Sequence, residues 1–242
     1  MYPQRLHPAA TEEALSMASE STIAALAGFP ELTASASLPS RLHEILEAAI
    51  IAGTLTPGQR IHADEIAGFY GISRIPVREA LRSLHQDGWV EIKPRYGVRV
   101  RGRTLVELDE LFEFRAELEA CVARFAAERR TDAELRAMHD ATARSAKARD
   151  DLDYAELDLC ASLFYSALRQ ACHNSVLERE SATMEKRARF YFSTVADRLG
   201  VDWTFVHEKL LGHVEAGEAD AAGALARHHI RNTGEAVRSL LF

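Results

Sequence analysis

One short segment, residues 73–84, limits what this chain can fold into more than any other. Its sequence is SRIPVREALRSL, in which Ser73 suits a helix N-cap and Pro76 suits the first helical turn. Apolar residues recur at helical spacing and would form one buried face: Val77, Ala80, Leu81 and Leu84. Arginines four residues apart line up along another face: Arg74, Arg78 and Arg82. The segment therefore predicts a short helix with one buried face and one cationic face.

The cationic face has two interpretations. Guanidinium groups match phosphate oxygens and the O6/N7 edge of guanine, so the helix would suit the major groove of DNA. The alternative is an ordinary solvated helix, and three arginines alone do not decide between the two.

The flanking sequence favours the DNA-binding interpretation. Residues 62–70 predict a second short helix, and Gly71 with Ile72 forms a turn before Ser73, which is the order of a helix-turn-helix. Residues 89–92 and 98–101 predict two strands, joined by a basic tip at residues 93–97. We therefore expect a winged helix-turn-helix with a small β-hairpin wing.

The residues before this segment fall into two parts. Ser40 is placed to cap a helix with an apolar stripe of Leu42, Ile45, Leu46, Ala49 and Ile50. Residues 1–37 form an N-terminal arm rich in Ala, Ser, Thr and Glu, in which residues 12–27 predict a weak helix ended by residues 28–30. A mobile arm and a partner-binding helix both remain open for it.

The spaced elements resemble the N-terminal domain of the GntR family of bacterial transcription regulators. The resemblance is carried by AGTLTPG at 52–58, Ala67, GISRIPVREAL at 71–81, Gly88 and Gly97, and covers about residues 38–103. It implies a homodimer that reads palindromic operator DNA through Ser73, Arg74, Ile75, Pro76 and Arg78 of the recognition helix and Gly97 of the wing. The cationic face and the basic hairpin tip add Arg82 and Tyr96 as candidate DNA-binding residues. Two residues depart from the family pattern. Ile75 replaces the usual threonine, and Asp64 stands where many members carry a phosphate-binding arginine.

From residue 104 to residue 242 the sequence predicts an all-α helical bundle. This part lacks proline and has few glycines, and its amphipathic runs cover 105–129, 132–150, 152–172, 175–199, 203–217 and 219–241. Thr131, Asp132 and Asp202 suit helix caps, and Gly200 suits a helix end. The expected fold class is thus mainly α: the winged domain over 38–103, then this bundle.

The bundle is similar to the FCD effector domain of the FadR subfamily. The similarity rests on LFEFRAELE at 111–119, AAER at 126–129, LFYSAL at 163–168, Asn174, Leu177, His207, Leu210, Leu211, Gly217, Glu218, Ala222, His229 and Ile230. It implies a pocket for a small effector, usually a carboxylate-bearing metabolite, and often a divalent metal such as Zn or Ni on one Asp and three His. It implies His173 in a left-handed conformation at a helix end, where the family prefers glycine.

The implied metal ligands are only half present. The family's Asp and first His fall on Ala161 and Tyr165, and the other two histidines fall on His207 and His229. Because zinc takes three or four protein ligands, two imidazoles would hold it poorly. Recruitment of Asp158 or Tyr165 as a further ligand remains open beside a metal-free pocket.

In a metal-free pocket, Arg115, Tyr165, His207 and His229 are the candidate effector-binding residues. Arg115 has two interpretations, a carboxylate clamp or an internal ion pair with Glu119 one turn later. Weaker candidates are His213, His228, Arg189 and Tyr191.

Composition limits the class of protein. The net charge is −7, yet residues 38–103 hold ten Lys/Arg and seven Asp/Glu, which gives this segment +3. The positive charge is therefore concentrated where DNA contact is expected. No run of eighteen apolar residues and no signal peptide is found, and Cys121, Cys160 and Cys172 form no C-x-x-C motif. We expect a cytoplasmic protein with reduced thiols and no membrane segment.

These observations predict a DNA-binding regulator whose operator binding responds to a small organic acid. An enzyme is not expected, because H-E-x-x-H, G-x-S-x-G and a glycine-rich phosphate loop are lacking. Two alternatives stay open: a dimeric DNA-binding protein without an effector, and a metal-dependent hydrolase.

Overall fold

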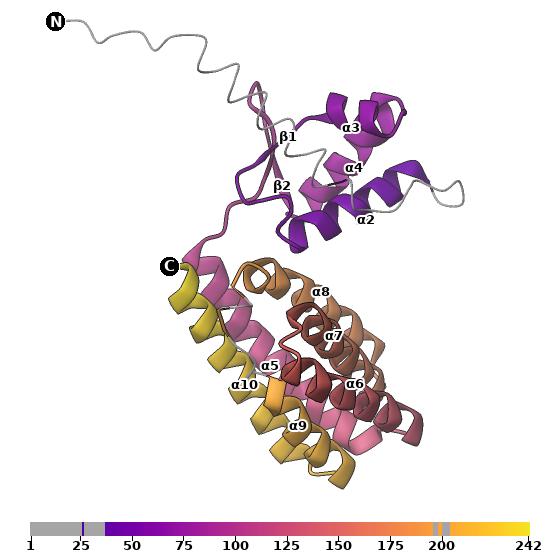
Figure 1. The fold of residues 1–242 in the computed structure, drawn as a ribbon, viewed down its shortest axis with the longest axis vertical. Helices are drawn as coiled ribbons and strands as arrows, with labels where there is room; N and C mark the ends of the chain where they lie inside the picture. The colour runs from indigo at the N-terminus through magenta and orange to yellow at the C-terminus, as the bar shows by residue number, and fades with distance from the viewer. Residues whose placement is uncertain (1–25, 27–36, 196–197, 200–203) are drawn as a thin grey trace, which may run out of the picture. The chain divides into compact units, whose positions relative to one another are not determined.

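The structure is a computed structural model that describes residues 26, 37–195, 198–199 and 204–242. The chain divides into two compact units, residues 1–103 and residues 104–242 (Figure 1). Apart from Leu26 and Ser37, the expected N-terminal arm lies outside the described residues, and so do the predicted helix end at Gly200 and cap at Asp202.

The first unit is a winged helix-turn-helix, which confirms the predicted fold class. Its elements are α2 (Leu38–Ile51), β1 (Arg60–Ile61), α3 (Ala63–Phe69), α4 (Arg74–Gln86), β2 (Val90–Lys93) and β3 (Gly97–Val100). The apolar stripe of each helix faces inward, so that residues such as Leu46, Ile66 and Leu84 are fully buried. The sheet is antiparallel, in the order β1-β3-β2. The predicted hairpin therefore carries a third strand, β1, which pairs Arg60 with Arg99.

Two predicted helix caps differ from what the structure contains. Ser40 was wrong as a cap, because α2 begins at Leu38 and has Ser37 at its N-cap, with a proline in the first turn. Ser40 lies inside the helix, with its Oγ 2.7 Å from the Oγ of Ser37. Ser73 does occupy the N-cap of α4, but its side chain makes no capping hydrogen bond. The start of α4 is thus fixed by the turn before it and by its buried face.

The second unit is an all-helical bundle, as predicted. Its helices are α5 (Leu105–Arg129), α6 (Asp132–Asp150), α7 (Tyr154–Ala171), α8 (Ser175–Phe192), α9 (Phe205–Ala216) and α10 (Ala219–Leu241). Thr131 caps α6 in a reciprocal capping box with Glu134. After α7, His173 has a φ of 45°, the left-handed conformation expected from the resemblance. Among the described residues, no helix has both the length and the hydropathy needed to cross a membrane.

Helices α5 and α10 lie side by side and run antiparallel (Figure 1). Glycines of α10 allow this approach, since Gly234 lies against Phe112 and Gly223 lies against Arg124. A Cβ atom at Gly234 would be 2.8 Å from the Cβ and Cγ atoms of Phe112. The close packing of this helix pair positions one wall of the pocket described below.

We predict that Gly234→Ala destabilises the bundle, whereas Gly212→Ala does not. The new methyl group at Gly234 must push Phe112 or the α10 backbone away, at a cost of about 1–3 kcal/mol. Gly212 is exposed inside α9 with no atom within 4 Å of its Cβ position, so alanine there should add up to about 1 kcal/mol of helix stability. Thermal unfolding followed by circular dichroism at a fixed protein concentration measures both. Equal shifts in Tm for the two variants would contradict the close packing of α5 on α10.

Candidate functional site

The cationic face of α4 is open to solvent. Val77, Ala80, Leu81 and Leu84 are buried, whereas Ser73, Arg74, Ile75, Arg78 and Arg82 are exposed and Pro76 is half-buried. Ile75 exposes 68% of its surface at the start of the helix, an unusual position for a branched apolar side chain without a partner. The helix thus presents one apolar and three cationic side chains on its outer side.

A groove of about 500 Å³ lies between α4 and the sheet. Arg78 and Arg82 line it from the helix, and Gly97 lines it from the wing. Sequence reasoning missed a further cation, Arg60 of β1, which also lines the groove. Its guanidinium lies against Gly97, with Nε 3.4 Å from the place where a Cβ atom would be. A two-residue strand has too little periodicity to be recognised from the sequence, so the position of Arg60 had no usable signal.

Arg74 is turned toward α3 rather than left free. Its Nε lies 2.9 Å from Oδ1 of Asp64, and both side chains are about 60% exposed. An exposed ion pair contributes little stability, about 0–1 kcal/mol, but it sets where the guanidinium points. Asp64 therefore places a negative charge on α3 where the family pattern has a positive one, and it also forms an ion pair with the first arginine of α4.

The tip of the wing carries the remaining predicted residue, Tyr96. It exposes 69% of its surface, and the preceding Arg95 has a left-handed φ of 67°. The structure thus brings Arg78, Arg82 and Gly97 together around one groove, while Tyr96 stands apart at the tip.

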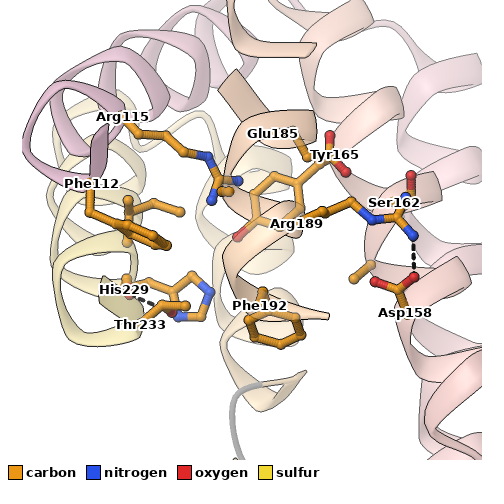
Figure 2. A pocket seen from close by; sticks show the side chains of 13 residues that line it. Phe112, Arg115, Asp158, Ser162, Tyr165, Glu185, Arg189, Phe192, His229 and Thr233 are labelled. Atoms are coloured by element: carbon orange, nitrogen blue, oxygen red, sulfur yellow. Dashed lines mark hydrogen bonds and ion pairs between the residues drawn. The ribbon is translucent and has the colours of Figure 1, made fainter. Parts of the chain in front are cut away.

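The second site is a pocket of about 70 Å³ inside the bundle, lined from α5, α7, α8 and α10 (Figure 2). Three of the four predicted effector residues line it: Arg115, Tyr165 and His229. Also lining it are Asp158, Ala161 and Arg189, which sequence reasoning had weighed, and Phe112, Ser162, Glu185, Ala188, Phe192, Ile230 and Thr233, which it had not. His207 is not among the lining residues, but its ring centroid is 5.3 Å from that of Tyr165 and 6.1 Å from that of His229.

Arg115 is a buried cation with an incomplete set of partners. It is 6% exposed, and its Nε lies 3.8 Å from Oε1 of Glu119, too far for a hydrogen bond. Glu119 accepts a hydrogen bond of 2.7 Å from the hydroxyl of Ser181. Within the described residues, the Nε of Arg115 has no hydrogen-bond partner. Arg115 therefore both pairs loosely with Glu119 and lines the pocket, and among the residues described the pair leaves its Nε without a hydrogen bond.

Two groups that line the pocket, His229 and Tyr165, and the nearby His207 are held in their neutral forms. Burial lowers the pKa of His207 to about 3, and burial together with the charge of Arg115 lowers the pKa of His229 to about 4. Burial also raises the pKa of the Tyr165 phenol, although the nearby Arg115 opposes this shift. At neutral pH the pocket therefore offers the neutral imidazole of His229 and the phenol of Tyr165 beside Arg115, together with the ion-paired carboxylates of Asp158 and Glu185.

These groups do not fit the divalent metal that the resemblance implies. Ala161 has no donor atom, and burial keeps the phenol of Tyr165 protonated. The carboxylate of Asp158 is paired with Arg189, and the guanidinium groups of Arg189 and Arg115 line the same pocket and would repel a cation. In the part of the chain that the structure describes, no cluster of three or more His, Cys, Asp or Glu side chains is arranged to hold a metal ion. The chemistry of the pocket favours an anion.

Comparison with known families gives two matches in the same order as the two units. Residues 38–100 match the bacterial regulatory proteins of the gntR family, and residues 110–232, about half of the chain, match the FCD domain.

Individual relatives that this chain resembles are transcriptional regulators. The uncharacterized HTH-type transcriptional regulator YdhC of Bacillus subtilis is 38% identical over 74 residues, which cover 31% of this chain and 33% of the relative. The HTH-type transcriptional regulator LutR of Bacillus subtilis is 29% identical over 207 residues, covering 74% of this chain and 92% of LutR. The solved structure of E. coli McbR/YncC has a TM-score of 0.74 at 19% identity, covering 86% of this chain and 100% of that chain, a likeness of fold. The chain spans a third to about a half of the length of the first three curated relatives that it matches.

We predict that His207→Phe makes the stability of the bundle less dependent on pH. Between about pH 3, the folded pKa, and 6.5, the unfolded pKa, the unfolded chain binds a proton at His207 that the folded chain does not. The wild-type protein should therefore lose stability as the pH falls below 6.5, by up to about 1.4 kcal/mol per pH unit from this group. The raised pKa of Glu119 has the opposite effect, because it adds stability as the pH falls. The prediction therefore concerns the difference in pH dependence between the variant and the wild type.

Urea unfolding at several pH values from 7.5 to 5 measures the difference. His139→Gln, which removes an exposed imidazole from α6, controls for the loss of a histidine. The burial of a neutral His207 is refuted if wild type and His207→Phe show parallel pH profiles.

Proposed function

The chain belongs to the GntR family of bacterial regulatory proteins and carries a C-terminal FCD domain, and on this premise we propose how it controls transcription. Residues 38–103 bind a palindromic operator, and residues 104–242 dimerise and bind a small anionic effector in the cytoplasm. The effector changes the relative pose of the two DNA-binding units, and with it the fit of both α4 helices to their half-sites. Because this family consists of transcription regulators, the hydrolase alternative is set aside.

The arginine groove supports the DNA-binding part of the proposal. Arg60, Arg78 and Arg82 surround one groove beside α4, and their charge lies in the segment with a net charge of +3. Guanidinium groups on a helix that enters the major groove contact phosphates and guanine edges, while a wing contacts the adjacent backbone. In this proposal Ser73, Ile75 and Pro76 approach the DNA from the start of α4, and Tyr96 and Gly97 approach it from the wing.

The single observation that carries the effector part is the buried Arg115. A guanidinium that is 6% exposed and lines a cavity is expected to bind an anion, because a carboxylate can accept two parallel hydrogen bonds from its fork. Neutral His229 and Tyr165 can donate hydrogen bonds to the same anion. Two carboxylates also line the pocket, but Asp158 is paired with Arg189 and Glu185 with Arg169. The ring of His207 packs edge-to-face against the rings of Tyr165 and His229 without lining the pocket itself.

Arg78→Ala should weaken DNA binding at least about tenfold without changing the fold. The probe is a duplex selected from a random pool by the wild-type protein, and binding is measured by fluorescence anisotropy at several salt concentrations. Loss of a phosphate contact would also reduce the slope of log affinity against log salt by about one. Arg136→Ala, an exposed arginine on α6 of the bundle, is the matched control. Wild-type affinity in Arg78→Ala would remove α4 as the recognition helix.

Asp64→Asn should strengthen binding to the same duplex by several-fold at low salt. The change removes a negative charge near the phosphates and releases Arg74 from its ion pair, so one more cation becomes available to DNA. The salt slope should become steeper by about one. In an Arg74→Ala background the additional slope should vanish, because no guanidinium is left to release. An equal gain in slope in both backgrounds would show that Asp64 does not act through Arg74.

A further inference from the structure

A second cavity, of about 410 Å³, adjoins the Arg115 pocket. Helices α9 and α10 contribute much of its lining, including Phe205, Lys209, Leu225, His228, Asn232 and Ala236. Its volume is in the range of about 300–1,000 Å³ typical of small-molecule sites. We call it the outer cavity and the Arg115 pocket the inner pocket.

The two cavities share part of their walls. Phe192, His229 and Thr233 line both. Figure 2 shows Arg115 toward the upper end of the inner pocket and these three side chains toward the lower end. The two cavities are therefore adjacent, and a ligand that starts at Arg115 reaches the outer cavity by passing between these shared side chains.

The inner pocket is too small for most metabolites. At about 10–15 Å³ for each water-sized position, 70 Å³ accommodates about five positions. That volume suits a carboxylate with a short stem. The rest of a larger acid has to lie beyond the shared wall.

The side chains along this route favour a flat, apolar body. Phe192 and the neutral imidazole of His229 are planar, and aromatic rings pack on one another in stacked or edge-to-face arrangements. Beyond them, Leu225 and Ala236 supply apolar contacts from α10. Lys209, His228 and Asn232 supply the polar groups of the outer cavity.

We propose that the ligand is an aromatic carboxylate with a short stem, whose acid group binds Arg115 and whose ring occupies the outer cavity beyond Phe192 and His229. The proposal rests on the proposed effector function, because it specifies the chemical class held at that site. It adds a second subsite, built by α9 and α10, that selects for the body of the acid rather than for its charge.

The test uses two acids that differ only by a phenyl ring, propionate and 3-phenylpropionate. Binding to the full-length protein is measured by calorimetry and by the shift in Tm. The ring should increase affinity at least about tenfold, since burial of its apolar surface adds to the same carboxylate contact. The neutral 3-phenylpropionamide should bind at least about tenfold more weakly than 3-phenylpropionate, because it cannot form a charged pair with Arg115.

Variants separate the two subsites. Leu225→Trp and Ala236→Phe fill the outer cavity from two positions on α10, and each should bring 3-phenylpropionate down to nearly the affinity of propionate. Ala224→Phe adds the same phenyl group to the exposed side of α10 and should have no effect. Arg115→Lys keeps a cation beside Glu119 but loses the bidentate fork, so it should weaken both acids by a similar factor.

Two negative outcomes are distinguishable. If both acids bind with equal affinity, depend on Arg115 and ignore the filling variants, the outer subsite is refuted while the anionic effector function stands. If neither acid binds and neither changes affinity for the selected duplex, the aromatic ligand class is refuted together with the outer subsite, and the anionic effector function then rests on acids of other classes. A filling variant that leaves the preference for 3-phenylpropionate unchanged also refutes the outer subsite.

Discussion

Buried charge is the constraint on which the C-terminal bundle depends. Arg115 and Glu119 of α5, Arg169 of α7 and Glu185 of α8 each expose 9% of their surface or less. Arg169 pairs directly with Glu185, whereas Arg115 reaches Glu119 only at 3.8 Å. Since a buried charge is costly unless it is paired and hydrogen-bonded, three helices must hold these side chains in register. The second pair is the looser one, and among the described residues it leaves the Nε of Arg115 without a hydrogen bond.

The same constraint decides what the pocket can hold. Burial favours the neutral forms of His207, His229 and Tyr165. At neutral pH these three groups therefore add no charge of their own beside Arg115. Replacement of two family ligand positions by Ala161 and Tyr165 removes donors that a metal would need. The pocket therefore presents a fixed positive charge, which favours an anion over a metal cation, although the fold is that of the FCD domain.

In the DNA-binding unit, a different balance of charge applies, because its arginines are exposed. The pairing of Arg74 with Asp64 contributes little stability, but it takes the first arginine of α4 into an ion pair with α3. Arg60 lies at the other side of the groove, held against the wing because Gly97 has no side chain there. The distribution of cations around the groove thus depends on α3 and β1 as much as on α4.

The sequence by itself determined the elements, because helix periodicity and most helix ends are local properties. The apolar face of α4 and the bounds of α5 and α6 follow from residues within a few turns, and the capping box of Thr131 spans three positions. Three residues of the pocket lining, Arg115, Tyr165 and His229, could be identified only because the resemblance supplied them. Tertiary structure alone decided the rest. Strand β1 exists because β3 pairs with it, and Arg60 meets Gly97 across 37 residues of chain. The wall shared by Phe192, His229 and Thr233 is likewise formed only when α8 packs near α10, a contact between residues too distant in sequence for any local pattern to encode.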